Sequence, residues 1–270
     1  MREISIRTPV QFLLLAVVLL YAGILLIAPI VAIIQGALSA GLNKLFDALT
    51  QPDVIHAFEL TFLLALGAVL VNTIAGITLA WVLVRHQFPG KRILNTLVDA
   101  PFVFSPVIAG YALILLFGRK GWFAPTAIPI AFAWPGMFLA TVFVSLPFVT
   151  REVQSVLAEL TREQEEVAYT IGASRWNTFR RIVLPQIWSG LLYGIVLTFA
   201  RSIGEFGAVA VVGGSVQGLT ETATVYVFRA LDKRDTVGAY GVSIVLGLLS
   251  IAILTIMSLL RTRSPRKQGR

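Results

Sequence analysis

Two opposite charges lie inside an otherwise apolar segment of this chain. Arg201 and Glu205 are four residues apart, so a helix would place them on one face and within reach of each other. An ionisable side chain at membrane depth is costly, and it is expected either to pair or to face a water-filled path. Two roles therefore stay open for this pair. It can hold its helix against a neighbour by mutual neutralisation, or it can form a polar element of a translocation path.

A second segment whose residues could have a functional role is D-A-P-F-V-F-S-P-V-I-A-G at 99–110. Prolines remove backbone donors and bend a helix, so protein or water must satisfy the carbonyls that they leave free. Such a break suits a hinge or a pore lining, or it is a packing kink at which Gly110 allows a neighbouring helix to approach closely. The candidate pore or gate residues are Asp99, Pro101, Ser105, Pro106, Gly110, Arg201 and Glu205.

Charged and polar residues dominate the segment 151–185. Thr161 and Gln164 have the spacing of a capping box, which predicts a helix that starts just after Thr161 with acidic residues in its first turn. Gly172 is placed to end that helix in a left-handed conformation, and a second short helix is expected from about Ser174. The segment therefore predicts a compact helix-turn-helix, after which Pro185 opens the next apolar run.

Apolar segments make up most of the rest of the chain. Hydrophobic residues account for 57% of the 270 residues and charged residues for only 13%, which is typical of a membrane protein. A spanning helix needs roughly 20 mainly apolar residues. Six stretches meet this requirement, at about 12–36, 58–84, 95–117, 134–150, 186–213 and 238–260. Residues 121–133 are expected to form a loop or an interfacial segment, because prolines interrupt them.

The distribution of Lys and Arg predicts which way the spans face. Both tails, the 85–92 connection and the 151–185 segment hold most of the basic residues, which places them on the cytoplasmic side. The net charge of +8 is explained by this topology, so nucleic-acid binding is not expected. The first span is interpreted as a retained helix, because its apolar core is longer than that of a secretory signal.

Several function classes lack the residues that they need. The chain has no cysteine and only two histidines, so a thiolate site, a disulfide framework or a convincing metal centre is not predicted. No G-x-x-x-x-G-K-[ST] phosphate loop is present, so any ATP-derived energy must come from a partner.

The run E-V-A-Y-T-I-G-A-S-R-W-N-T-F-R-R-I-V-L-P, from Glu166 to Pro185, resembles the E-A-A-x3-G-x9-I-x-L-P signature of ATP-binding-cassette (ABC) importer permeases. Val167 departs from the alanine that the family often has. Further runs at 99–110, 115–122, 135–144, 147–153 and 200–209 are similar to the sulfate/molybdate group of these permeases. Within that group, Ser105-Pro106, G-L-L-Y-G at 190–194 and G-L-T-E-T at 218–222 are similar to the W-type sulfate subunits.

This resemblance implies an all-α polytopic protein with the type I ABC importer permease fold, six transmembrane helices and both termini in the cytoplasm. A single transmembrane domain would span 1–270, with its core at about 57–260 and a cytoplasmic coupling loop at 151–185. The residues that the resemblance assigns to coupling with an ATPase are Glu165, Glu166, Ala168, Gly172, Ile182, Leu184 and Pro185.

The resemblance also implies partners and cargo. A T-type permease subunit would complete a heterodimeric pore in the plasma (inner) membrane. Two cytoplasmic ATPases would bind ATP and Mg, and an extracytoplasmic binding protein would deliver sulfate, often also thiosulfate. This chain would bind no cofactor and catalyse no reaction itself. The alternatives are a molybdate or tungstate permease, an ion-coupled secondary transporter that uses Arg201 and Glu205, and a membrane-embedded enzyme, for which no catalytic set is present.

Overall fold

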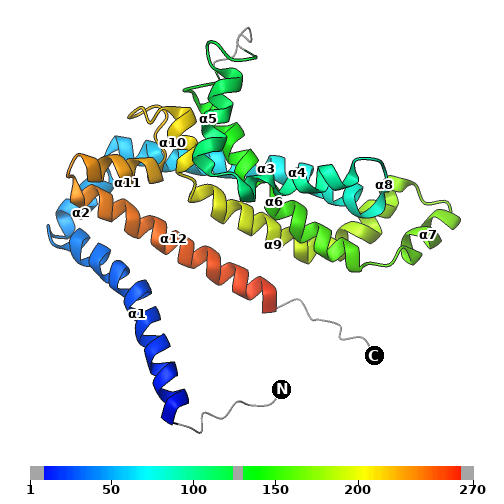
Figure 1. The fold of residues 1–270 in the computed structure, drawn as a ribbon, viewed down its shortest axis with the longest axis horizontal. Helices are drawn as coiled ribbons and strands as arrows, with labels where there is room; N and C mark the ends of the chain where they lie inside the picture. Colours follow the sequence, from blue (N-terminus) through cyan, green and yellow to red (C-terminus); the bar gives the residue numbers. More distant parts are fainter. Residues whose placement is uncertain (1–8, 124–129, 263–270) are drawn as a thin grey trace. The chain divides into compact units, whose positions relative to one another are not determined.

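The computed structural model describes residues 9–123 and 130–262, and every regular element within these ranges is a helix (Figure 1). The elements are α1 (Pro9–Leu38), α2 (Leu42–Leu49), α3 (Pro52–Arg85), α4 (Lys91–Val103), α5 (Pro106–Phe117), α6 (Trp134–Glu159), α7 (Glu163–Thr170), α8 (Arg175–Thr178), the π-helical η1 (Phe179–Val183), α9 (Leu184–Ile203), α10 (Gly207–Gly213), α11 (Ala223–Asp232) and α12 (Thr236–Thr262). The predicted all-α class is confirmed.

Five helices of the described chain are long and apolar enough to cross a membrane. They are α1, α3, α6, the continuous helix from Arg175 to Ile203 and α12. The pair α4 and α5 adds a sixth span only if the two count together, because they meet at a bend of 112°. The polytopic prediction is confirmed, and the break expected in the third span is present.

Three boundaries differ from the predictions. α6 continues to Glu159, so residues 151–159 belong to a helix whose inner face is packed, and the loop itself is shorter. The predicted span over 186–213 ends at Ile203 and is followed by the separate helix α10. The helices α2 and α11 were not expected, since they are too short for the span criterion. Of the loop expected at 121–133, residues 121–123 and 130–133 are non-helical, and 124–129 lie outside the described residues.

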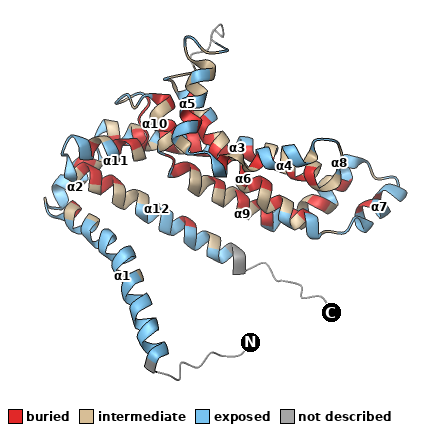
Figure 2. Cartoon of the chain, viewed as in Figure 1, coloured by how far each residue is buried: buried red, intermediate tan, exposed pale blue. Residues whose placement is uncertain are grey.

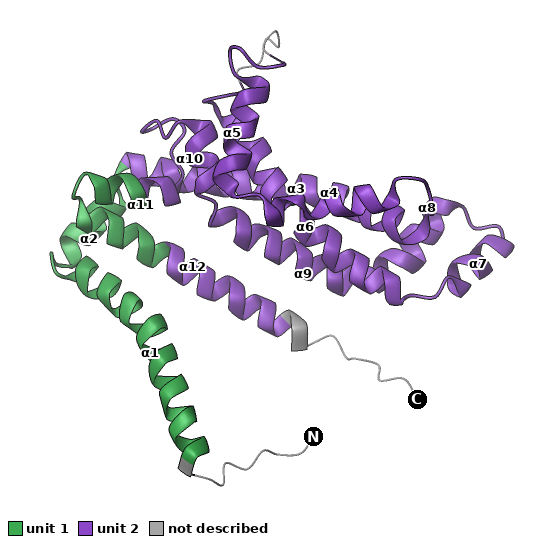
Figure 3. Ribbon diagram, viewed as in Figure 1, with its two compact units in different colours: residues 1–51, 227–245 green, residues 52–226, 246–270 purple. Residues whose placement is uncertain are grey.

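The chain divides into two compact units, which we describe separately (Figure 3). The first comprises residues 1–51 and 227–245. Its helix α1 is apolar, yet none of its most apolar window is buried, as Figure 2 shows. Such a surface is stable only beside lipid or another apolar chain. Within this unit the ring of Tyr240 lies directly against Gly36, where a larger residue would clash.

The second unit comprises residues 52–226 and 246–270 and contains a core in which α3, α6 and α9 pack together (Figure 2). Val149 of α6 is fully buried between Gly76 of α3 and Gly194 of α9, and these glycines allow both helices to approach closely. Asn72 of α3 donates hydrogen bonds to the Val142 carbonyl at 3.0 Å and to Ser145 Oγ at 2.9 Å. These contacts bind α3 to α6 along a shared apolar and polar seam.

Candidate functional site

The helix α7 begins near the predicted position but without the predicted cap. Its first turn carries three glutamates, which suit the positive end of the helix dipole. The N-cap is Arg162, and no side chain caps the helix, so the capping box of Thr161 and Gln164 is wrong. The physical reason is competition, because Gln164 Oε1 instead accepts a hydrogen bond from Gln186 Nε2 of α9 at 2.7 Å.

Gly172 ends α7 as predicted. Its φ is +85°, in the left-handed region that a side chain disfavours. The Gly172 N–H donates to the Tyr169 carbonyl at 3.1 Å, and the Ala173 N–H donates to the Ala168 carbonyl at 2.9 Å. This pair of bonds is a Schellman motif, which satisfies the carbonyls at the end of the helix.

The second short helix also begins where predicted. Ser174 is the N-cap of α8, and its Oγ accepts a hydrogen bond from the Asn177 N–H at 3.3 Å. From there the chain stays helical through the π-helical turn η1 into α9, with Pro185 in the first turn of α9. Proline has no N–H to donate, and the wider turn before it removes the need for a chain break. The loop therefore joins the span directly.

The predicted coupling residues lie on different surfaces of this segment. In α7, Glu165 and Ala168 are buried, whereas Glu166 is exposed. Gly172 lies exposed at the turn, next to Ile171, whose side chain is 80% exposed. The exposed surface of the turn is therefore acidic at one end and apolar at the other.

The remaining coupling candidates lie where the loop enters the span. Ile182 is half-buried in η1, and Pro185 is exposed. Leu184 packs against the core cluster that includes Val183 and Ile187. This end of the signature connects the loop to the core of the second unit.

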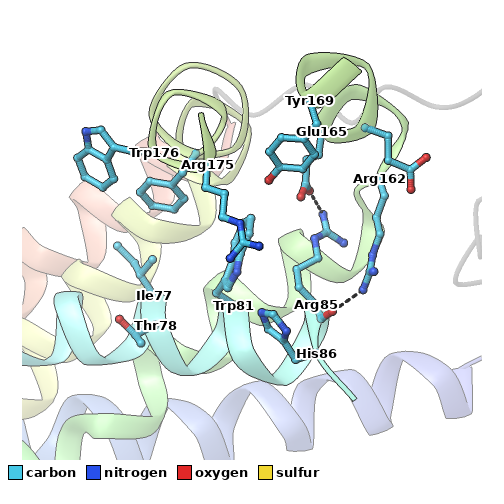
Figure 4. Close-up of a pocket in the computed structure, with 12 residues that line it drawn as sticks. Ile77, Thr78, Trp81, Arg85, His86, Arg162, Glu165, Tyr169, Arg175 and Trp176 are labelled. Atoms are coloured by element: carbon cyan, nitrogen blue, oxygen red, sulfur yellow. Dashed lines mark hydrogen bonds and ion pairs between the residues drawn. The ribbon is translucent and has the colours of Figure 1, made fainter. Parts of the chain in front are cut away.

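A pocket of about 860 Å³ lies between the end of α3 and the α7–η1 segment (Figure 4). Aromatic rings form part of its wall. The Phe179 ring meets Trp81 edge-on at a centroid separation of 5.8 Å and stacks on Trp176 at 5.7 Å. Arg85 and Glu165 form an ion pair at the same place, with 2.7 Å between Arg85 Nη2 and Glu165 Oε1. Arg85 was not predicted as a site residue, because in the sequence it counts only as a basic residue that indicates topology.

The first pore candidate, Asp99, is held in a polar network between α4 and α6. Arg151 Nε donates to Asp99 Oδ1 at 2.7 Å, and Arg151 Nη2 donates to Asp99 Oδ2. The same guanidinium also donates to Asn95 Oδ1 at 2.8 Å and to Gln154 Oε1 at 2.6 Å. Asp99 thus orients α4 on α6. Arg151 was also missed, because a partner 52 residues away leaves no local signal.

The proline-rich break separates α4 from α5. Pro101 is buried inside α4, whereas Pro106 begins α5 and follows Ser105, its N-cap. A Cβ at Gly110 would lie 2.7 Å from the Ala208 carbonyl oxygen of α10. Close approach at Gly110 was one of the two alternatives left open for this break, and the neighbour that approaches is α10.

Arg201 and Glu205 pair as predicted, with 2.6 Å between Arg201 Nη1 and Glu205 Oε2. The expectation that one continuous helix carries both is wrong, because α9 ends at Ile203. Glu205 Oε1 accepts a hydrogen bond from the Ala208 N–H at 2.9 Å, and the Glu205 carbonyl accepts one from Thr224 Oγ1 at 2.6 Å. One buried carboxylate therefore neutralises Arg201 and also holds the start of α10.

The two breaks lie against each other. A Cβ at Gly207, beside the α9–α10 break, would lie 3.1 Å from Val107 Cγ2 and 3.4 Å from Pro106 Cβ, beside the α4–α5 break. Thus α5 and α10 form one packed pair, and the candidate pore residues Pro106, Gly110 and Glu205 are brought together. Asp99 lies apart from them in the Arg151 network.

Comparison with known proteins agrees with this arrangement. Residues 72–269 match the family model described as binding-protein-dependent transport system inner membrane component. The sulfate transport system permease protein CysW of Synechocystis sp. PCC 6803 is 44% identical over 94% of each chain. CysW of Escherichia coli K12 is 40% identical over 96% of this chain and 91% of the relative. CysT of the same Synechocystis strain is 40% identical, over 91% and 87% of the two chains.

Solved structures share the fold. A chain of a bacterial ABC transporter involved in import of the acidic polysaccharide alginate matches with a TM-score of 0.76 at 17% identity, over 96% of each chain. The MetNI methionine ABC transporter matches with a TM-score of 0.56 over 78% of this chain and 94% of that one. The chain belongs to the family of binding-protein-dependent transport system inner membrane components and is similar to its sulfate permease subunits CysW and CysT.

Proposed function

We propose that this chain is a pore-forming subunit of an ATP-driven sulfate importer, with thiosulfate as a second cargo. The observation that carries the proposal is identity of 40–44% to CysW proteins over nearly the whole chain. The absence of a phosphate loop from the sequence supports a subunit that catalyses nothing itself. ATP and Mg are then bound by partner ATPases, and this chain holds no cofactor.

The α7–α8 turn is the part of this chain that docks on an ATPase. Glu166 and Gly172 are exposed there, and the apolar side chain of Ile171 lies beside them. Closure of two ATPase subunits would displace this turn, and the continuous helix from Arg175 to Ile203 would carry the movement into the membrane. In this scheme Ile182, Leu184 and Pro185 transmit the movement to the core.

The pore requires a second permease chain, and a T-type sulfate subunit is the partner that the CysT relatives support. The external partner is a sulfate-binding protein. A structural neighbour of the same fold was solved with a periplasmic protein carrying its alginate ligand, which supports this type of assembly. The protein lies in the inner membrane. Both termini lie in the cytoplasm, because basic residues concentrate in the two tails, the 85–92 connection and the 151–185 segment.

The packed α4–α5 and α9–α10 breaks are the candidate gate. Their backbone is irregular at Ser105 and Glu205, and irregular backbone at membrane depth is tolerated where protein or a water-filled path satisfies it. Asp99 orients α4, the helix that leads into this gate and contains the buried Pro101, through its bonds to Arg151.

Reconstitution tests the proposal. The chain is co-expressed with the T-type subunit and the ATPase, purified, and placed in liposomes with the binding protein. We expect ATP hydrolysis and uptake that depend on sulfate and thiosulfate; stimulation by molybdate alone would assign the molybdate class instead. Transport by the purified chain without an ATPase would contradict the ABC mechanism and favour a secondary transporter.

Two substitutions test the docking turn within this system. Glu166→Ala combined with Gly172→Val should reduce recovery of the ATPase with the membrane subunits and reduce uptake. The control is Glu163→Ala, which removes the same charge from an exposed position in the first turn of α7. If the double variant binds the ATPase and transports as well as the control, the docking role is wrong.

A further inference from the structure

The inner face of α7 is attached by few groups. Of its eight residues, only Glu165 and Ala168 are buried. Ala168 has a small side chain, so most of the attachment of this face depends on what Glu165 contacts. A helix can move its neighbours only through contacts that stay formed while it is displaced. The partner of Glu165 is therefore important.

That partner is Arg85, the last residue of α3. The two side chains are only 8% and 9% exposed, and Arg85 Nη2 lies 2.7 Å from Glu165 Oε1. Figure 4 shows the arginine reaching from the end of α3 toward α7 across one side of the pocket. A buried pair of this kind resists separation, because either charge left alone would be desolvated without compensation.

Two further bonds make Arg85 a junction of three helices. Arg85 Nη1 donates to the carbonyl of Leu160, the C-cap of α6, at 3.3 Å. Arg162 Nη2, at the start of α7, donates to the Arg85 carbonyl at 2.7 Å. The Arg85 guanidinium also lies 6.0 Å from the centre of the Trp81 ring, which helps to fix its direction. The ends of α3 and α6 and the start of α7 are therefore held at one residue.

A second polar contact joins α7 to a long helix and can be compared with the Arg85–Glu165 pair. Gln164 and Gln186 connect α7 to α9 through one neutral hydrogen bond, and this bond is exposed to solvent. Water can replace either partner there at little cost. The two contacts differ in burial and charge, although both join the same short helix to a long one.

We propose that Arg85 is a positioning residue for energy coupling, and that its buried ion pair with Glu165 carries displacement of α7 into α3. The inference rests on the proposed function, since it assumes that an ATPase moves the α7–α8 turn. It also assigns Glu165 a different role from Glu166. Glu165 faces inward and transmits the movement, whereas Glu166 faces outward and receives it. From α3 the movement reaches α6 through the buried Asn72 and the close contact at Gly76.

The test uses the full transporter in liposomes and measures sulfate taken up per ATP hydrolysed. Arg85→Gln, Glu165→Gln and the double variant are compared with the unmodified chain. We expect each single variant to lower this ratio by about 2- to 30-fold, the range found for substitutions along coupling networks, while the ATPase still co-purifies. The double variant should lie near the single variants, because both remove the same link. Effects that multiply in the double variant would overturn the proposal.

The control is Gln186→Ala, which removes the exposed contact between α7 and α9 and should leave the ratio unchanged. An equal loss in this control would show that losing any contact of α7 lowers the ratio, and the specific assignment to Arg85 would be wrong. If the single variants fail to assemble, the double variant decides, because it leaves no buried charge unpaired. A ratio equal to that of the unmodified chain in the double variant overturns the proposal, and a lowered ratio supports it.

A distance measurement separates coupling from mere stability. The chain has no cysteine, so spin labels can be placed at Glu163→Cys in α7 and Ile74→Cys in α3, both exposed positions. In the labelled chain that keeps the Arg85–Glu165 pair, we expect the distance between the two labels to stay constant when nucleotide is added. With Arg85→Gln it should change or broaden. A constant distance in both backgrounds would contradict the link. Failure of the unmodified chain to bind an ATPase would instead contradict the proposed function, so the two failures are distinguishable.

Discussion

The turn between α7 and α8 and the turn between α9 and α10 both interrupt helical chain, but different groups hold them. The first is exposed and is closed by backbone hydrogen bonds around Gly172, followed by the local cap at Ser174. The second is exposed at Gly204 and Phe206, but it depends on the buried side chain of Glu205, which pairs with Arg201 and accepts the Ala208 N–H, and on Thr224 Oγ1, which donates to the Glu205 carbonyl. Water can substitute for lost bonds at the first turn, whereas no such replacement is at hand for Glu205.

This difference suits the proposed roles. An exposed turn with a local structure presents the same surface to a partner whether or not the transmembrane helices move. A turn that depends on the ion pair of one buried carboxylate has a defined closed arrangement, and losing a single bond affects α9, α10 and α5 together. The following substitutions test this contrast.

The largest effect is expected at Glu205. Glu205→Ala leaves Arg201 without its partner and α10 without its first acceptor, and breaking a buried pair in this way costs about 3 kcal/mol or more. We expect a clear fall in the thermal unfolding temperature of the purified complex and loss of transport. Glu159→Ala removes an exposed glutamate at the end of α6 and should have little effect.

A paired substitution identifies the reason for that loss. Arg201→Ala leaves the Glu205 carboxylate, whose side chain is 2% exposed, without its charged partner. This variant should therefore impair assembly or transport more than the combined change Arg201→Ala with Glu205→Ala. The measurement is the yield of folded complex and its uptake rate. A double variant no better than Arg201→Ala would show that mutual neutralisation is not the main role of the pair.

The next effect is expected where the two helix breaks meet. Gly110→Ala would place a Cβ 2.7 Å from the Ala208 carbonyl oxygen, and overpacking of this kind costs about 1–3 kcal/mol. Thermal unfolding of the complex measures this cost. Gly247→Ala is the matched control, since a Cβ there meets nothing within 4 Å. Equal stability of the two variants would contradict close packing of α5 on α10.

A smaller and local effect is expected at the exposed turn. Gly172→Ala forces a side chain into the left-handed region at φ +85°, which costs about 1–2 kcal/mol although the space around it is open. Gly172→Asn should be milder, because asparagine tolerates this conformation. Hydrogen exchange of α7 amides and ATPase recovery measure the effect. A fall in stability of the whole complex as large as that of Glu205→Ala would erase the contrast between the two turns.

The smallest effect is expected at Asp99. Its side chain is 41% exposed, and Arg151 would keep its bonds to Asn95 and Gln154 after Asp99→Asn. An exposed pair of this kind contributes up to about 1 kcal/mol. We expect a small change in thermal unfolding that high salt reduces further. A loss of transport with unchanged stability would instead give Asp99 a role in the gate.

Features that depend on neighbouring residues were predicted well. The left-handed end of α7 at Gly172, the start of α8 at Ser174 and the first-turn proline of α9 follow from local backbone preferences. The apolar spans near α3, α6 and α12 follow from length and hydropathy. The pairing of Arg201 with Glu205 was also predicted, because residues four apart can meet.

Features that depend on distant partners were missed or placed wrongly. The capping box failed because Gln164 bonds to Gln186 instead. α6 extends to Glu159 because residues such as Val153 and Leu157 pack in the core, although the local sequence resembles a polar loop. The expected continuous fifth span is broken, because Glu205 is held by Arg201 and by the start of α10.

The sequence by itself determined that this chain is a helical membrane protein with a polar helix-turn-helix between two of its apolar spans, because hydropathy, capping and glycine preferences act over a few residues. Only the tertiary structure decided that Arg85 pairs with Glu165, that Asp99 pairs with Arg151, and that the two helix breaks pack on each other. Those pairings join residues far apart in the chain. The free energy of burying a charge is low only when the fold brings its partner to it.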